Sequence, residues 1–451
     1  ELESRLAELT RGLDADGRPV GVLAARLAGK DGGELAELAG ALGLHVGKPG
    51  VEPGGTADPR PPWPRRRSNL GQLARALQRA PERRPTIAAA WEVLSSEDAS
   101  FARRWAAGVH LCRLTRELVR GDPAQAAAWA ARVGQTAGTL AAVSGPVGGF
   151  ESRMADFLGT FASAHVGNAL RVQGHLLVAE RFFLPWEEDD HLGLRAEYLA
   201  LKATLRRVQR RPAEAIALFE EADRIASRGD FPGAAELTAR IRIAHAHALE
   251  MMGELEEAAA LLRTVLTPRT PLSTHLPTMP PGGLPPRLRF ITLQNLAGHL
   301  SRAGHLDEAA SWLTEADELG ATLALPEIDL LRVQWVRSRI EVRKSWHAGV
   351  DTLGAVRERL LELGLVYDAA LASLEIAEWH AEQIKGDEAD PEHVAAIREL
   401  ATESAAFFAG QDVGPEAIAA LALFQHVSSV SIPTASILRK IGRLLRQTAM
   451  S

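Results

Sequence analysis

The sequence is poor in cysteine and tyrosine and has no long apolar stretch. Cys112 is the only cysteine among 451 residues, so an intramolecular disulfide is excluded, and tyrosine occurs twice. One cysteine suits a reducing compartment, and we therefore expect a cytoplasmic protein. No run of 18 or more apolar residues occurs, so neither a transmembrane helix nor a membrane partner is expected. We expect Cys112 to be an inert core residue.

The sequence also lacks a strong charge of either sign. It has 51 Lys and Arg against 57 Asp and Glu, which gives a formal net charge of −6. A chain with this balance has no overall field that would attract DNA or an acidic membrane. Two short basic stretches, at 60–67 and 439–446, could contact DNA phosphates locally. We do not expect DNA to be a partner, but it stays an alternative.

Motifs that would indicate an enzyme are missing. There is no HExxH, GxSxG, GxxxxGK[ST] or CxxC pattern. His245 and His247 are two residues apart on a predicted helix and so point to different sides, while His299, His305 and Asp307 flank a predicted turn. We expect no catalytic residues, no cofactor and no metal site.

The clearest pattern present is a pair of amphipathic helices in residues 290–319. Apolar residues recur three and four positions apart, as on one face of an α-helix. Gly304 lies where the first helix should end, because glycine readily adopts positive φ. Asp307 and Glu308 then fall in the first turn of the second helix, where carboxylates are favourable. The sequence predicts two helices packed against each other.

This pattern recurs, with the turn at residues 174, 210, 253 and 304 and a weaker copy near Lys344. The intervals are 36, 43 and 51 residues, and the longest contains residues 267–287, which include seven prolines. Such a segment cannot form a helix. It is interpreted either as an arm that covers a binding surface or as a disordered surface loop.

The spacing of small and apolar residues around the turns resembles the tetratricopeptide (TPR) repeat. The residues that carry the resemblance in the clearest copy are Ala297, Gly304, Ala309, Leu313 and Ala316. Residues 60–451 as a whole resemble bacterial TPR proteins that often carry a helix-turn-helix head. The resemblance implies an all-α fold, a right-handed α-α superhelix in which neighbouring repeats bury each other's apolar faces.

We expect five parts along the chain. Residues 1–46 form a small N-terminal helical segment, interpreted either as a degenerate DNA-binding head or as a capping bundle. A linker rich in Pro, Gly and Arg follows at 47–68. Residues 69–150 begin the solenoid and 151–432 hold the TPR-like repeats with the 267–287 insertion. Residues 433–451 are expected to form a basic C-terminal capping helix.

The expected function is that of a non-enzymatic scaffold or adaptor whose concave groove binds a protein or peptide. In TPR solenoids the first helix of each repeat lines this groove, and arginine suits capture of carboxylates, which favours an acidic ligand. The alternative is the sensor and dimerisation part of a transcriptional regulator, and homo-oligomerisation stays open. The candidate groove residues are Asn168, Arg171, Lys202, Arg206, Arg242, Gln294, Asn295, Arg332, Gln334 and Arg337.

Overall fold

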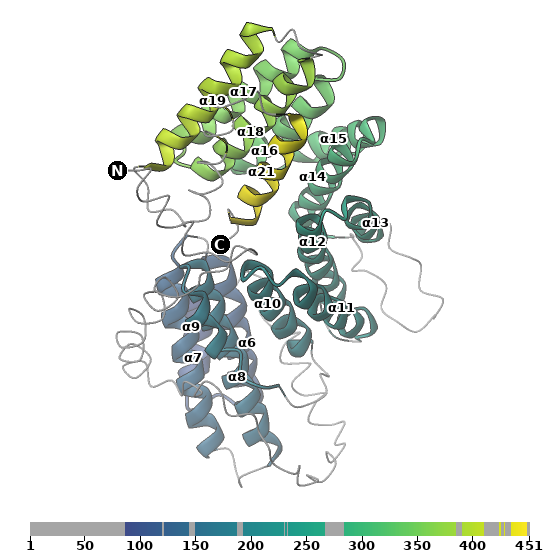
Figure 1. The fold of residues 1–451 in the computed structure, drawn as a ribbon. Helices are drawn as coiled ribbons and strands as arrows, with labels where there is room; N and C mark the ends of the chain where they lie inside the picture. Colours follow the sequence, from purple (N-terminus) through teal and green to yellow (C-terminus); the bar gives the residue numbers. More distant parts are fainter. Residues whose placement is uncertain are drawn as a thin grey trace. The chain divides into compact units, whose positions relative to one another are not determined.

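The computed structural model describes residues 86–448 with internal gaps. The gaps are at 120, 144–148, 187–192, 230, 232, 267–283, 385–389, 410–423, 425–427 and 429–433. The expected N-terminal segment 1–46, the linker 47–68 and most of the proline-rich insertion therefore lie outside the described residues. The described part is all-helical and contains no strand, as the sequence predicts (Figure 1).

Sixteen helices are described. They are α5 (Ile87–Ser95), α6 (Phe101–Leu118), α7 (Pro123–Val143), α8 (Phe150–Val172), α9 (Leu176–Arg181), α10 (Leu194–Val208), α11 (Pro212–Arg228), α12 (Ala234–Met252), α13 (Leu255–Leu266), α14 (Pro286–Ala303), α15 (Leu306–Gly320), α16 (Glu327–Glu341), α17 (Trp346–Glu362), α18 (Val366–Gln383), α19 (Pro391–Ala409) and α21 (Ala435–Thr448).

Contacts divide the described chain into two compact units, with the boundary between Ile241 and Arg242 inside α12. In the first unit α7 packs along α8, α6 contacts both, and α10 packs on α11. Trp105 on α6 is completely buried, and its indole Nε1 donates to the Met154 carbonyl on α8 at 2.8 Å. Cys112 lies in the same apolar core with no exposed surface.

The turns predicted from the sequence share one backbone geometry. All four turn residues have positive φ: Gly174 (84°), Arg210 (60°), Gly253 (88°) and Gly304 (95°). Just after each, an amide donates five residues back to the end of the preceding helix, as in a Schellman motif. These bonds are His175 to Leu170 and Arg211 to Arg206 at 2.9 Å, Glu254 to Leu249 at 3.0 Å and His305 to Leu300 at 2.9 Å.

A fifth turn of this type, outside the positions marked by the sequence pattern, joins α17 to α18. Gly364 has φ of 71°, and the Leu365 amide donates to the Leu360 carbonyl at 2.8 Å. The same local geometry therefore ends helices in both units, and it fixes the direction in which the next helix leaves.

Small residues allow the paired helices to approach closely. A Cβ added to Gly167 on α8 would lie 2.9 Å from the Ala179 carbonyl oxygen on α9. Ala203 on α10, Ala246 on α12 and Ala297 on α14 occupy the corresponding positions in their helices, and all are completely buried. A larger side chain at these positions would push the helices apart.

In the second unit each helix packs on its neighbours from α13 to α19, and α21 returns to pack on α18. Leu438 and Ile441 of α21 are buried in the same core as residues of α18. Arg439 on the same helix contacts Glu378 at 3.2 Å and Glu382 at 3.9 Å, both on α18. This basic side chain therefore has carboxylate partners within the chain.

None of the helices in the described ranges has the length and apolar character that crossing a bilayer requires.

Candidate functional site

An open pocket of about 160 Å³, lined mostly by polar and charged residues, lies in the second unit. It is formed by α12, α14, α16 and α18, which are the first helices of four successive pairs. From the sequence we expect first helices to line a binding groove, and that expectation stays a prediction at this pocket. The lining residues are His247, Glu250, Gln294, Asn295, Gly298, His299, Arg302, Arg332, Trp335, Val336, Arg339 and Leu371.

Helical periodicity explains why these side chains share one surface. Residues three, four and seven positions apart lie on one face of a helix. On α14 this spacing aligns Asn295, His299 and Arg302, and on α16 it aligns Arg332 with Arg339. α14 and α16 therefore each contribute a polar stripe to the pocket, whereas α18 contributes the apolar Leu371.

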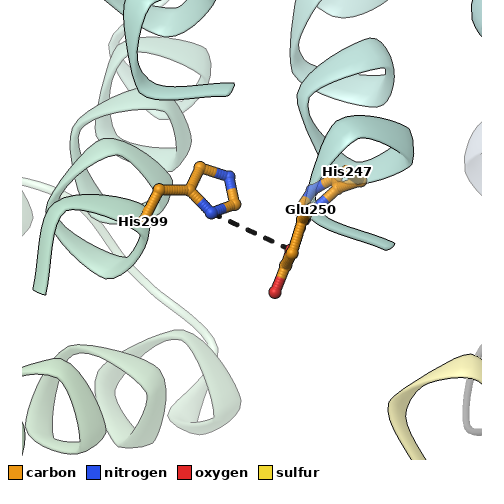
Figure 2. Close-up of side chains that lie close together, drawn as sticks. All are labelled: His247, Glu250 and His299. Carbon is orange, nitrogen blue, oxygen red and sulfur yellow. Dashed lines mark hydrogen bonds and ion pairs between the residues drawn. The ribbon is translucent and has the colours of Figure 1, made fainter. Parts of the chain in front are cut away.

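Two histidines and a glutamate that line the pocket lie close together (Figure 2). Glu250 Oε2 lies 3.5 Å from His247 Nδ1 on the same helix and 3.9 Å from His299 Nδ1 on α14. The two imidazole rings have centroids 6.2 Å apart and are nearly perpendicular. One donor atom from each of the three residues lies within 4.8 Å of the others, which is a spacing that could hold a metal ion.

The other oxygen of Glu250 is held by Arg302. The Arg302 guanidinium donates to Oε1, and both side chains are largely shielded from water. Burial by itself would raise the pKa of Glu250, but Arg302 and the two histidines lower that pKa well below its usual value. Glu250 is therefore a fixed carboxylate anion at neutral pH.

His299 is the buried member of the cluster. Only 4 % of it is exposed, and its Nε2 has no hydrogen-bond partner among the described residues. Burial is the main cause that lowers its pKa to about 4, with Glu250 opposing the shift. The ring is thus neutral near pH 7, with a nitrogen lone pair available to a ligand.

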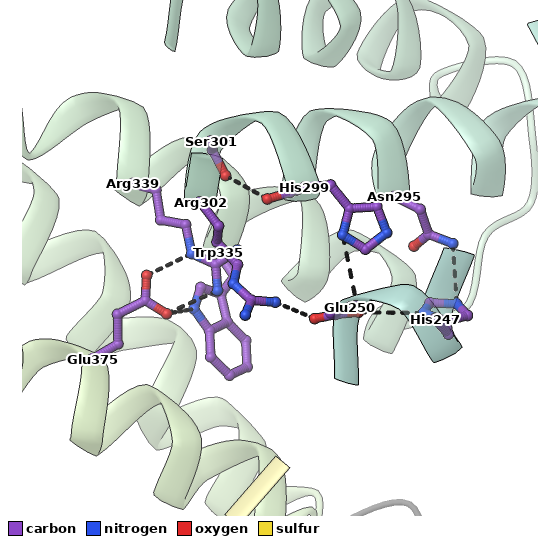
Figure 3. Close-up of polar contacts among 10 residues, drawn as sticks. His247, Glu250, Asn295, His299, Ser301, Arg302, Trp335, Arg339 and Glu375 are labelled. Carbon is purple, nitrogen blue, oxygen red and sulfur yellow. Dashed lines mark hydrogen bonds and ion pairs between the residues drawn. The ribbon is translucent and has the colours of Figure 1, made fainter. Parts of the chain in front are cut away.

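Neighbouring side chains extend the polar network (Figure 3). Asn295 Nδ2 lies 3.4 Å from His247 Nε2. On the other side Arg339 makes two hydrogen bonds to Glu375 of α18, at 2.5 and 2.8 Å, and the Trp335 indole donates to the same carboxylate at 2.9 Å. The charge of Arg339 is therefore neutralised by Glu375.

Arg332 differs from the other two arginines of the pocket. About half of its side chain is exposed, and its ion-pair contact is Asp329 Oδ1 at 3.9 Å. Asp329 itself is engaged more closely by Arg287, at 3.0 Å. The Arg332 guanidinium is consequently the pocket cation with the most capacity for a new partner.

The structure brings three of the residues proposed from the sequence to this pocket: Gln294, Asn295 and Arg332. Arg337 is five residues after Arg332, so it points elsewhere and pairs with Asp317 at 2.6 Å. Arg242 donates to Thr264 at 3.1 Å, and Gln334 does not line the pocket.

The remaining proposed residues belong to the first unit. Arg171 donates to Asn168 at 3.0 and 3.2 Å, and Arg206 pairs with Glu180 at 2.7 Å. Lys202 is near Arg206, and burial lowers its pKa, with Arg206 adding to the effect. Asn168, Arg171 and Arg206 thus have partners on their own or neighbouring helices.

No sequence pattern places His247, Glu250 and His299 together. The nearest histidine to His299 in the pattern, His305, has its Nε2 in contact with Glu256 at 2.5 Å and does not line the pocket. The sequence does show that His247 and Glu250 are spaced for one face of a helix, and that Asn295, His299 and Arg302 are spaced for one face of another. It does not show that these two faces pack against each other, because that depends on the tertiary structure.

No family model, no curated protein and no solved structure matches this chain.

Proposed function

We propose that this protein is a non-enzymatic binding module of the tetratricopeptide type, a right-handed helical solenoid that recognises a protein or peptide partner through its first helices. An acidic group of the partner enters the pocket and contacts Arg332. The observation that carries the proposal is the polar pocket formed by first helices from four successive pairs, with Arg332 exposed in it.

The repeated turn geometry supports the repeat assignment. Four turns at the positions that the sequence pattern marks have positive φ and the same backbone hydrogen bond. Stacked helix pairs of this kind form an extended surface on which one helix of each pair is available to a ligand. A peptide crossing α12, α14 and α16 would contact equivalent positions of successive repeats.

The charges of the pocket favour an acidic group over a basic one. Arg302 and Arg339 are matched by Glu250 and Glu375, while the half-exposed Arg332 has a 3.9 Å contact to an already engaged Asp329 and an electrostatic interaction with Asp368. A carboxylate would gain a charge-assisted hydrogen bond from Arg332, for which the typical contribution is about 1.5–3 kcal/mol. The amide side chains of Gln294 and Asn295 can bind the backbone of the same ligand.

Peptides that differ only in charge would test this proposal. Binders selected from a random peptide library would be compared with versions in which Glu and Asp are replaced by Gln and Asn and the C-terminus is amidated. Fluorescence anisotropy gives the dissociation constants. We expect the acidic forms to bind at least about tenfold more tightly, with an advantage that shrinks at high salt.

Two arginines on one helix provide matched variants. Arg332→Ala should weaken binding of the acidic peptides about tenfold or more, because it removes the pocket cation. Arg337→Ala removes the same charge from α16 outside the pocket and should change the affinity less than twofold. Equal affinity in the parent and Arg332→Ala, or equal losses in both variants, would contradict recognition at this pocket.

A further inference from the structure

We propose that His247, Glu250 and His299 bind a divalent transition-metal ion of the Zn²⁺ class. The site lies in the pocket of the second unit and joins α12 to α14. Metal binding goes beyond the proposed peptide recognition and does not depend on it. The donor set consists of two imidazoles and one carboxylate, which occurs in three-ligand zinc sites that keep a fourth position open.

The distances are close to those of a coordinated ion. Zinc ligands at about 2.0–2.2 Å in tetrahedral geometry lie roughly 3.3–3.6 Å from one another. Glu250 Oε2 is already 3.5 Å from His247 Nδ1 and 3.9 Å from His299 Nδ1. His247 is about one-third exposed, and so its ring can adjust to complete the cluster.

The state of His299 indicates a missing partner. Its ring is almost completely buried and lines the pocket, yet its Nε2 lacks a hydrogen bond within the described chain. Its Nδ1 faces Glu250 at 3.9 Å, which exceeds hydrogen-bonding distance. A metal ion between Nδ1 and Glu250 Oε2 would replace this long contact with a coordinate bond, and Nε2 would then carry the ring proton.

The surrounding residues can orient the ligands. Arg302 holds Glu250 Oε1 and leaves Oε2 directed at the two imidazoles (Figure 2). Asn295 contacts His247 Nε2, the nitrogen that faces away from the carboxylate. With a metal ion on Nδ1, that Nε2 would carry a proton and donate to the Asn295 side-chain oxygen after rotation of the amide.

The same charges limit the affinity. Arg302 already neutralises Glu250, so a divalent ion would add positive charge to a pocket that also contains Arg332 and Arg339. An anion in the open coordination position would relieve this excess. Under the proposed function that anion is the carboxylate of the ligand; water or a buffer anion would take its place when the metal binds alone.

The test uses the full chain and the metal alone. Zn²⁺ is titrated in competition with a chromophoric chelator, and Co²⁺ is added separately to record the visible absorption of a bound, low-coordinate ion. We expect one ion per chain. His247→Ala should weaken Zn²⁺ binding at least about tenfold and abolish the Co²⁺ bands, since it removes a ligand from a partly exposed position where folding is tolerant.

Controls separate the site from incidental chelation. His305→Ala removes an exposed histidine that also contacts a glutamate, and it should leave Zn²⁺ binding unchanged. Glu250→Gln keeps the shape of the side chain and should weaken the binding, with circular dichroism confirming the fold. Absence of stoichiometric binding in the parent, or equal affinity in the parent and His247→Ala, would overturn the metal site. Neither result would bear on the acidic-peptide experiment, which contains no metal.

Discussion

At the residue scale, buried histidines make stability depend on pH. His165 on α8 is 2 % exposed, and burial lowers its pKa to about 3, with Arg116 and Arg113 adding to the effect and Glu197 opposing it. The ordinary value is 6.5, so the unfolded chain binds a proton at pH 5 that the folded chain does not. The contribution of neutral His165 to the free energy of unfolding is therefore fully present above about pH 6.5, and it is lost as the pH falls from 6.5 toward 3.

The substitution His165→Gln should remove this dependence. Between pH 4 and 6 the free energy of unfolding should rise less steeply with pH in the variant, by up to about 1.4 kcal/mol per pH unit. Urea unfolding of both proteins across this range measures the slopes. His175→Gln changes an exposed histidine of the same unit and serves as the matched control for the substitution itself. Identical slopes in the parent and His165→Gln would show that His165 is protonated in the folded state.

Single residues also show the limit of prediction from sequence. Gln294, Asn295 and Arg332 were assigned to the first-helix surface because the TPR resemblance indicates which helix binds ligands, and they line the pocket. His247 and His299 are 52 residues apart, and no local pattern links them. Their proximity follows from the packing of α12 and α14, which requires three-dimensional information.

At the scale of single elements, the turns depend on backbone conformation more than on side-chain contacts. Gly304 has φ of 95°, and a Cβ added there would meet no atom within 4 Å. Any cost of a substitution therefore comes from the left-handed backbone conformation, which disfavours residues with a side chain by about 1–2 kcal/mol. This turn was predictable from sequence because glycine itself is the local signal.

Two glycines in the second unit form a matched pair. Gly304→Ala should lower the free energy of unfolding by about 1–2 kcal/mol. Gly354→Ala lies inside α17, also meets no atom within 4 Å, and should raise it by about 0.5–1 kcal/mol because alanine favours helix. Chemical denaturation monitored by circular dichroism compares them. Equal effects of the two substitutions would contradict a special role for the turn conformation.

At the scale of the whole molecule, a stack of helix pairs needs its last apolar face covered. Leu438 on α21 is 1 % exposed and belongs to the core that contains residues of α18, while the adjacent Ile437 is 38 % exposed. Repeat arrays commonly end in a segment with one apolar and one polar face. The sequence predicted such a capping helix from its basic composition, but which residues pack inward depends on its contact with α18.

Placing a carboxylate at Leu438 or at the neighbouring Ile437 tests whether α21 stabilises the chain by covering α18. Leu438→Asp places an unpaired carboxylate in the core and should lower stability by about 3 kcal/mol or more, with increased protease cleavage and binding of a hydrophobic dye. Ile437→Asp should have an effect within about 0.5 kcal/mol. If both variants resisted the protease as well as the parent does, α21 would not stabilise the α18 face.

The complete burial of Cys112 has a practical consequence for work on this chain. Burial and the nearby Glu197 raise the pKa of the thiol far above its ordinary value, and the side chain has no exposed surface. Thiol reagents react with accessible thiolates, so the folded native chain should resist maleimide labelling. A cysteine introduced at an exposed position can therefore carry a fluorescent or spin label selectively, without first removing the native cysteine.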